Sequence, residues 1–352
     1  MPTPAPPPSV KRKASMVLRL GLASGVVLVT LGLAEVGSRL AGPVPYRAPP
    51  EQRQDGSWHE RIHRPSNVPG LSYELVPSHP SVSQGQKNRT NSLGMRDAPL
   101  RERGQRLVRI AFVGDSYTFG WAVPQGVTFV NNLERLLNQA SSDPKRVFEV
   151  LNMGVSGYST RDEAIVLREK ALPLDPDLVL VGYVLNDPEI DPIQPLHASF
   201  QETELWQYSS LARRIARALY KRDLAAQGGG NYTRYLHANP RKWQSVVDAF
   251  GDMAAAAQAA GVPVAVVILP TLPRESWEGY AYEAIHGQVA DAARAAGLPV
   301  IDLLSGMRRF DKPGRLRIAA ADEHPNVQGH EIIGQLLFEQ LKDDRALLPR
   351  GP

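Results

Sequence analysis

Cysteine is absent from the 352-residue sequence. This absence excludes disulfide bonds, a thiol nucleophile, a cysteine-ligated zinc site and an N-terminal cysteine that carries lipid. It does not separate oxidising from reducing surroundings, because both tolerate a chain without thiols. A large excess of one sign of charge is also absent. The sequence has 40 Lys and Arg residues and 36 Asp and Glu residues, for a net charge of +4. Without a basic stripe interleaved with aromatic residues, this excess argues against nucleic acid as a partner.

Two further patterns are missing. The sequence shows no internal repeat, and the segment from Gly114 to Gly120 lacks the Gly-Lys-Ser or Gly-Lys-Thr ending of a phosphate-binding loop. Nucleotide binding is therefore not expected. What the sequence does contain is 43% apolar and 22% charged residues, over a length that suits one large domain with appendages.

The N-terminal segment has the composition of a membrane-directed helix. A Pro-rich start and the basic cluster Lys11 to Lys13 precede a charge-free run from Leu20 to Ala34. A helix of that length covers roughly 22 Å of a hydrocarbon core about 30 Å thick. A helix from Met16 to Leu40 is long enough, with arginines reaching both interfaces, but it places Glu35 near the headgroups.

Two interpretations of this segment remain open. In the first, which we favour, it is an uncleaved single-pass anchor over residues 15–41 with its basic end in the cytoplasm. In the second, it is a signal peptide cleaved after Ala34, where small residues occupy the required positions. Both place the rest of the chain outside the cytoplasm, on the periplasmic or extracellular side. Residues 1–14 are then expected to be a disordered tail, and residues 42–105 a linker and an arm packed on the following domain.

From residue 106 onward, apolar runs of strand length alternate with segments of helical periodicity. Near-continuous apolar runs are typical of strands buried on both faces, and therefore of a parallel sheet covered by helices. The sequence predicts a three-layer α/β/α sandwich over residues 106–347, around a central five-stranded, mainly parallel sheet, with a helical insertion at about 188–235. The expected strands are 107–113, 147–153, 177–184, 262–269 and 298–303. The expected helices are 127–140, 162–172, 202–224, 240–260, 280–296 and 327–342, the last capped by Asn326.

Polar groups suited to acyl transfer stand at the ends of the expected strands, where open parallel sheets bind their ligands. Ser116 follows the first strand in a Gly-Asp-Ser turn, Gly154 ends the second, and Asn186 follows the third. His324 lies just before the last helix. A hydroxyl, a backbone N–H, a side-chain amide and an imidazole are the parts of a serine acyl-transfer centre.

Four motifs in this order resemble the SGNH (GDSL-like) hydrolase superfamily. They are GDSYTFG at 114–120, NMGVSGYS at 152–159, GYVLND at 182–187 and DEHPNVQGH at 322–330. The resemblance spans roughly residues 107–345, and the preceding NSLGMRD recurs in membrane-anchored members. It implies the flavodoxin-like fold of that superfamily.

The resemblance also implies roles for individual residues. Ser116 would be the nucleophile, His324 the general base, and Asp322 the residue that orients the imidazole. The backbone N–H groups of Ser116 and Gly154, with the side-chain amide of Asn186, would form the oxyanion hole. Neither a metal ion nor an organic cofactor is expected.

The aspartate departs from the commonest pattern of this superfamily, which has Asp three residues before the catalytic His. That position is Ala321 here, and Asp322 stands two residues before His324. Glu323 or a backbone carbonyl therefore remains an alternative partner for the imidazole.

Other polar residues are interpreted as structural. Arg96, in NSLGMRD, is expected to form a salt bridge with a carboxylate. His330 is expected to be a structural neighbour inside the last helix. His197 and His237, in the insertion, are expected to be exposed.

The predicted function is that of a serine esterase or deacetylase, which hydrolyses a carboxylic ester through an acyl-serine intermediate. Location and family analogy indicate an O-acyl group on an envelope or extracellular glycan or lipid, with the membrane bound through the N-terminal helix. Two alternatives stay open: an O-acyltransferase that uses the same centre with a sugar hydroxyl as acceptor, and a non-catalytic glycan-binding envelope protein. The sequence does not indicate an oligomeric state.

Overall fold

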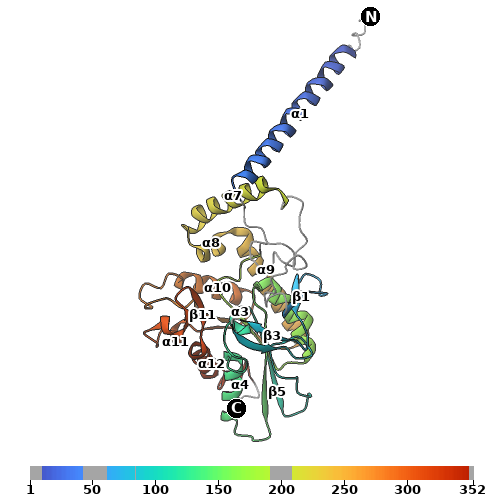
Figure 1. The fold of residues 1–352 in the computed structure, drawn as a ribbon. Coiled ribbons are helices and arrows are strands. Elements are labelled where there is room, and N and C mark those ends of the chain that lie inside the picture. The colour runs from blue at the N-terminus through green and yellow to red at the C-terminus, as the bar shows by residue number, and fades with distance from the viewer. Residues whose placement is uncertain (1–9, 43–61, 84, 191–207, 349–352) are drawn as a thin grey trace, which may run out of the picture. The chain divides into compact units, whose positions relative to one another are not determined.

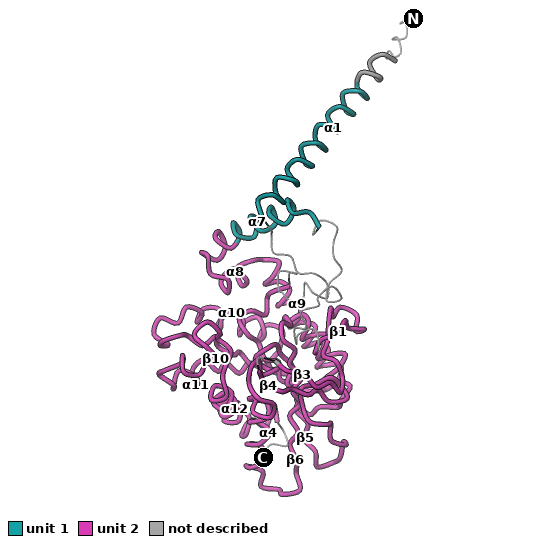
Figure 2. The backbone as a smooth tube through the Cα atoms, in the orientation of Figure 1, with its two compact units in different colours: residues 1–47, 202–223 teal, residues 48–201, 224–352 magenta. Residues whose placement is uncertain are grey.

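The residues that the computed structural model describes are 10–42, 62–83, 85–190 and 208–348. The chain divides into two compact units (Figure 2), which are residues 1–47 with 202–223, and residues 48–201 with 224–352. We call the first the N-terminal unit. We call the second the sheet unit, because it contains every sheet that the described residues form.

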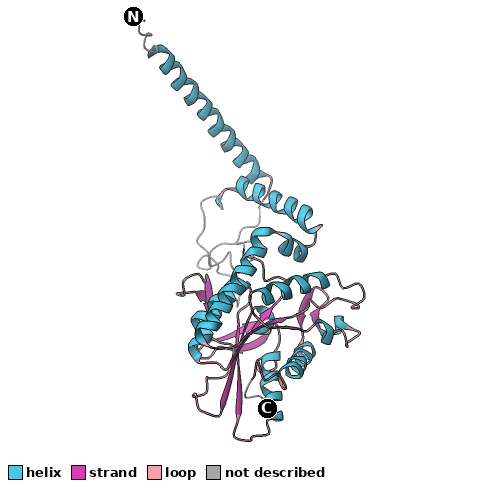
Figure 3. Ribbon diagram, turned by 180° about the vertical axis from the view of Figure 1, so that it is seen from behind, coloured by secondary structure: helices cyan, strands magenta, loops and turns pink. Residues whose placement is uncertain are grey.

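A five-stranded sheet forms the centre of the sheet unit (Figure 1, Figure 3). Its strands in spatial order are β6 (Val147–Gly154), β5 (Leu107–Gly114), β7 (Leu178–Tyr183), β8 (Val264–Ile268) and β9 (Val300–Asp302). Every neighbouring pair is parallel. The predicted sheet is thus confirmed, and its pairing is parallel throughout. All residues of β5, β7 and β8 are buried, as expected for strands covered on both faces. The one charged residue among them, Arg109 of β5, pairs with the buried Glu149 of β6 at 2.8 Å.

Helices cover both faces of this sheet. Alternate residues of β5 point to opposite faces, so that Val113 belongs to one apolar core and Phe112 to the other. The first core includes α5 (Thr160–Val166), α9 (Pro240–Ala260) and α10 (Glu283–Ala295), and the second includes α4 (Phe129–Ala140) and α12 (Val327–Leu341). The predicted three layers are therefore present.

The helix boundaries agree closely with prediction for α9 and α12. α9 has the predicted bounds. Asn326 caps α12 as expected, and its side chain accepts from the Gly329 N–H at 3.0 Å. α5 is shorter than predicted, because the chain continues after it as a π-helical turn (Leu167–Ala171) and a 3-10 turn (Leu172–Leu174).

The predicted insertion contains α7 (Ser210–Gly228) and α8 (Tyr232–Ala238), while residues 191–207 lie outside the described part. α7 is followed by Gly229 and Gly230, which both have the positive φ angles that glycine tolerates. The remaining short helical segments are α3 (Ser116–Phe119), α11 (Leu304–Met307) and a 3-10 turn (Pro313–Leu316).

The arm before the sheet contains strands that the sequence does not predict. β1 (His63–Pro65) pairs with β2 (Tyr73–Leu75), and β3 (Pro80–Ser83) pairs with β4 (Gln86–Arg89), both antiparallel. Strands of three or four residues are too short to show an alternating pattern above the background of a polar segment.

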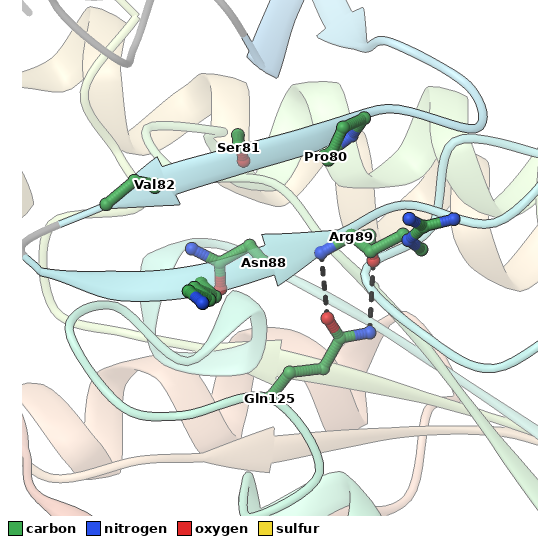
Figure 4. Close-up of a pocket in the computed structure, with 7 residues that line it drawn as sticks. Pro80, Ser81, Val82, Asn88, Arg89 and Gln125 are labelled. Carbon is green, nitrogen blue, oxygen red and sulfur yellow. Dashed lines mark hydrogen bonds between the residues drawn. The ribbon is translucent and has the colours of Figure 1, made fainter.

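The arm is held against the rest of the sheet unit by apolar and polar contacts. Ile62 and Tyr73 are fully buried in the first core. Figure 4 shows a hollow between the β3–β4 hairpin and Gln125, whose side-chain amide exchanges two hydrogen bonds with the backbone of Arg89 at 2.8 and 3.0 Å. The hairpin is thereby tied to the loop that follows α3.

The N-terminal unit is built around α1 (Val10–Leu40). Its segment Met16–Leu40 has a mean hydropathy of 2.0, and no part of its most apolar stretch is buried, so it is long and apolar enough to cross a membrane. α1 begins at Val10, so the basic cluster at 11–13 is helical, in contrast to the disordered tail predicted over residues 1–14. The first nine residues lie outside the described part.

Glu35, the charge that a membrane span accommodates least easily, has a structural role in this unit. Its carboxylate accepts from the backbone N–H groups of Ser210 and Leu211, both at 2.9 Å, and pairs with Arg39 at 2.6 Å. These N–H groups belong to the first turn of α7, which offers them no intrahelical acceptor. Glu35 therefore caps a helix whose first residue is 175 positions further along the chain.

Candidate active site

Ser116 stands at the turn between β5 and α3. Asp115 caps α3 by accepting from the Tyr117 N–H at 2.8 Å, and the Gly120 N–H closes the helix by donating to the Ser116 carbonyl at 3.1 Å. Gly120 has a φ of 81°, a left-handed conformation that favours glycine. At the first position of this four-residue helix, the Ser116 N–H has no intrahelical acceptor.

Arg96 braces this turn, which corrects the expectation of a salt bridge. Its buried guanidinium donates to the carbonyl oxygens of Phe119 at 2.6 Å, Gly120 at 3.1 Å and Val123 at 2.6 Å, and to Asn88 Oδ1 at 2.5 Å. Burial lowers the pKa of Arg96 to about 10. The fork of N–H groups suits several converging carbonyls, which is why arginine stands here.

Asp97, the next residue, holds the end of β6. Its carboxylate accepts from the backbone N–H groups of Asn152 at 2.7 Å and Ala98 at 2.8 Å, and burial raises its pKa to about 6. Asn152 in turn donates from Nδ2 to the Thr118 carbonyl at 2.8 Å. NSLGMRD therefore supports the turn at residues 114–120, which we call the nucleophile turn after the predicted role of Ser116.

Gly154 lies at the end of β6, in register with Gly114 of β5. A side chain at this position would overlap the backbone of Phe119, so glycine is what allows α3 to approach the strand. The Gly154 N–H donates to Asn152 Oδ1 at 3.1 Å. This N–H group thus lies beside the nucleophile turn with an acceptor already in place.

Asn186 follows β7 and meets the nucleophile turn at Asp115. Its Nδ2 lies 3.4 Å from Asp115 Oδ2, and the Ser116 hydroxyl lies 3.2 Å from the same oxygen. Asp115 is fully buried, and this burial raises the pKa of its carboxyl. The structure therefore brings the predicted amide and the predicted nucleophile together around one carboxylate.

A buried ion pair fixes the loop that carries Asn186. The side chains of Glu189 and Lys242 form a salt bridge and are each 2% exposed. The Tyr232 hydroxyl donates to the same Glu189 carboxylate at 2.7 Å. Since Tyr232 belongs to α8 and Lys242 to α9, the insertion and the helix after it hold this loop in place.

Lys242→Met is expected to lower the free energy of unfolding by about 3–5 kcal/mol, because it leaves the Glu189 carboxylate buried without its cation. The double variant Lys242→Met/Glu189→Met should regain most of the loss, because an apolar pair leaves no charge to compensate. Urea unfolding of both variants and the wild type measures the two effects. Equal stability of the single and double variants would contradict this role of the pair.

His324 and Asp322 lie on a hairpin that the sequence does not predict, in which β10 (Arg317–Ala319) pairs with β11 (Asp322–Pro325). Side chains two residues apart on a strand point to the same face, so both catalytic candidates share one side of β11. His324 Nε2 lies 2.8 Å from Ser116 Oγ, and His324 Nδ1 lies 2.6 Å from Asp322 Oδ1. The three residues form one hydrogen-bonded chain.

Asp322, and not Glu323, is the acidic partner of the imidazole in this geometry. Asp322 Oδ1 also accepts from the backbone N–H of His324 at 3.1 Å. The hydrogen bond from the imidazole lowers the pKa of Asp322, which favours its ionised form. Glu323 is exposed, and its backbone carbonyl accepts from the Tyr117 hydroxyl at 3.0 Å.

Two of the other buried histidines have pKa values that burial lowers. His330 accepts from the Phe129 N–H at 3.1 Å, and burial lowers its pKa to about 3. His237 is 4% exposed, which corrects the expectation that it is exposed. Its Nε2 lies 2.8 Å from the Tyr183 hydroxyl, and burial lowers its pKa to about 4. His197 lies outside the described residues.

The groups that meet here can carry out acyl transfer. The imidazole is placed to accept the Ser116 proton, and the Asp322 carboxylate is placed to stabilise the resulting imidazolium. N–H donors of the turn and of Asn186 can stabilise a developing oxyanion. Among the residues that the structure describes, no three His, Asp or Glu side chains are grouped as ligands of a metal ion.

Residues 112–332, more than half of the chain, match the GDSL-like lipase/acylhydrolase family. The chain belongs to this family. It is a serine ester hydrolase of the GDSL type, and its Ser116, His324 and Asp322 have the arrangement that such chemistry requires. Among curated proteins, none matches the sequence.

Several solved structures are similar to this acylhydrolase. Acetylxylan esterase Axe2 from Geobacillus stearothermophilus is 17% identical, with a TM-score of 0.42 over 66% of this chain and 93% of that one. A putative lipolytic protein of the G-D-S-L family from Desulfitobacterium hafniense DCB-2 is 13% identical, with a TM-score of 0.40 over 66% and 99%. A two-domain esterase (CEX) active on acetylated mannans is 17% identical, with a TM-score of 0.41 over 70% of this chain and 51% of that one. The present chain therefore spans about half the length of the two-domain esterase.

Proposed function

We propose that this acylhydrolase removes an O-acyl group from an envelope or extracellular glycan or lipid, through an acyl-serine intermediate. The supporting observation is the chain of hydrogen bonds from Ser116 Oγ to His324 Nε2 at 2.8 Å and from His324 Nδ1 to Asp322 Oδ1 at 2.6 Å. In this proposal α1 anchors the protein as a single membrane span with its basic end in the cytoplasm, and the sheet unit acts on the other side.

The reaction would proceed in two halves. His324 accepts the Ser116 proton while Oγ attacks the ester carbonyl carbon, and the N–H groups of Ser116 and Gly154 and the Asn186 amide stabilise the oxyanion. The ester C–O bond then breaks, His324 protonates the leaving alcohol, and the acyl group stays on Ser116. A water molecule next gives a proton to His324 and attacks the acyl-serine. Carboxylic acid leaves and Ser116 regains its proton.

The three proposed oxyanion donors differ in the hydrogen bonds that they make in this structure. The Ser116 N–H has no intrahelical acceptor, whereas the Gly154 N–H donates to Asn152 Oδ1 at 3.1 Å. One N–H of the Asn186 amide faces Asp115 Oδ2 at 3.4 Å. An amide nitrogen has two N–H groups, so Asn186 keeps a second one for the oxyanion.

Asn186→Ala should lower kcat for p-nitrophenyl acetate about 10²- to 10³-fold, because it removes one donor aimed at charge that develops in the transition state. KM should change little, since the uncharged ester carbonyl gains less from this donor than the oxyanion does. Steady-state kinetics measure both constants, and circular dichroism reports whether the variant is folded. Asn186→Asp, which keeps the shape but removes the N–H groups, should be at least as slow. Wild-type kcat in either variant would exclude Asn186 from the oxyanion hole.

The exposure of the catalytic groups suits an ester that is presented on a large molecule. The side chain of His324 is 24% exposed, and that of Asp322 is 32% exposed. An acyl group at the surface of a glycan or lipid can reach such groups without the whole substrate entering the protein.

Purified full-length protein in detergent tests the proposed function. It should hydrolyse p-nitrophenyl acetate and release acetate from acetylated glycan fragments, and a comparison with butyrate and octanoate esters should define the acyl length. A fluorophosphonate should label the protein, and mass spectrometry should place the phosphonate on the peptide that contains Ser116. If neither ester turnover nor labelling occurs, the proposal is wrong. Turnover that rises only on addition of a sugar acceptor would instead indicate an O-acyltransferase.

A further inference from the structure

Trp121 follows α3, and the Trp121 backbone is fixed relative to Ser116. The Trp121 N–H donates to the Ser116 carbonyl at 3.0 Å. Gly120, immediately before it, adopts a left-handed conformation, and its carbonyl is bound by the Arg96 guanidinium at 3.1 Å. The start of the Trp121 side chain therefore has a defined position beside the active site.

The indole ring of Trp121 lies against the imidazole of His324. The two ring centres are 5.8 Å apart, and their planes are 31° from parallel. Tyr117 contacts the same imidazole, with ring centres 5.1 Å apart. An aromatic ring near the imidazole favours the imidazolium, which forms only when Ser116 has given up its proton. Tyr117 in α3 and Trp121 just after it thus place two aromatic rings against His324 of the β10–β11 hairpin.

The Trp121 side chain also hydrogen-bonds to Asp322, and this bond adds to the larger effect of His324 in lowering the pKa of the Asp322 carboxyl. Two features of Asp322 leave its carboxylate weakly held without a second hydrogen-bond partner. Its side chain is 32% exposed, and its hairpin consists of strands of only three and four residues outside the five-stranded sheet.

We infer that Trp121 is a positioning residue of this active site, whose indole N–H holds the Asp322 carboxylate and whose ring restrains the His324 imidazole. It would thereby keep the hairpin aligned with the nucleophile turn. Alignment matters because a displacement of about 1 Å between reacting groups can lower a rate about 10²-fold. The inference rests on the proposed acyl-serine mechanism and adds a residue that is none of the Ser, Gly, Asn and His of the four motifs.

Two substitutions separate the two parts of this role. Trp121→Phe keeps an aromatic ring but removes the N–H, and should lower kcat for p-nitrophenyl acetate about 10-fold. Trp121→Ala removes both and should lower kcat about 10²-fold. KM should stay within about threefold of the wild type, because the role concerns protein groups and not the substrate. Trp243→Phe, in α9 beside His237, is the matched control and should leave kcat unchanged.

A double-mutant cycle tests whether Trp121 acts through Asp322. In an Asp322→Asn background, Trp121→Phe should have little further effect on kcat, because the charge that receives its hydrogen bond is already gone. A full 10-fold loss in that background would overturn the inference, as would wild-type kcat in Trp121→Phe alone. A higher KM with unchanged kcat would also overturn it, since that result indicates contact with the substrate. An inactive wild-type protein would instead refute the proposed function itself.

Discussion

Ser116→Ala should lower kcat for p-nitrophenyl acetate about 10⁶-fold, the largest loss expected from any substitution in this protein. The variant lacks the oxygen that carries the acyl group in the proposed mechanism, so His324 has no proton to accept. The turnover that remains would come from the N–H donors and from substrate binding alone. Initial rates measure the loss, and fluorophosphonate labelling should disappear at the same time.

Ser156→Ala is the matched control for this experiment. Ser156 follows Gly154, is 5% exposed, and its hydroxyl has no hydrogen-bond partner among the described residues. Its removal should leave both turnover and labelling intact. Loss of labelling in Ser156→Ala, or labelling that persists in Ser116→Ala, would mean that the nucleophile is assigned to the wrong serine.

Asp322→Asn should lower kcat roughly 10⁴-fold, the second largest effect. The asparagine has nearly the same shape, but it removes the negative charge that stabilises the imidazolium. Its amide can also donate to His324 Nδ1, which would leave the proton on the nitrogen that should accept from Ser116. Steady-state kinetics at neutral pH measure the change in kcat.

Glu323→Gln is the control that distinguishes the role of the Asp322 carboxylate from an effect of removing any negative charge from the hairpin. The Glu323 side chain is exposed, and its backbone carbonyl accepts from the Tyr117 hydroxyl at 3.0 Å. The substitution keeps that carbonyl, so kcat should stay within about threefold of the wild type. A large loss in Glu323→Gln together with a small loss in Asp322→Asn would reverse the assignment.

The sheet and the chemical groups at its edge are predictable from sequence because both depend on local patterns. Continuous apolar runs identify strands buried on both faces, and parallel strands bring their carboxyl ends to one edge. Ser116, Gly154 and Asn186 follow three such strands, so their proximity can be expected without knowledge of any contact. His324 is identified by its motif, because its hairpin is too short to give a strand pattern.

The supports of the site are not predictable in the same way, because they depend on contacts between distant segments. Arg96 has the charge of a salt-bridge residue, but its partners are carbonyl groups that α3 presents only after the chain has folded. His237 is buried because its hydroxyl partner, Tyr183, lies on the central sheet. Glu35 is an unfavourable charge in an apolar helix by sequence, and only the structure shows that it accepts hydrogen bonds from the N-terminus of α7.

The position of Asp322 and His324 on one strand affects how such enzymes are found in sequence collections. A search that demands Asp three residues before His would discard this chain, although its imidazole has a carboxylate partner at 2.6 Å. Conversely, a natural insertion of one residue between Asp322 and His324 would make the chain satisfy the search and turn the carboxylate to the opposite face of β11. In this hairpin, therefore, a spacing of two is what places the carboxylate and the imidazole on the same face of β11.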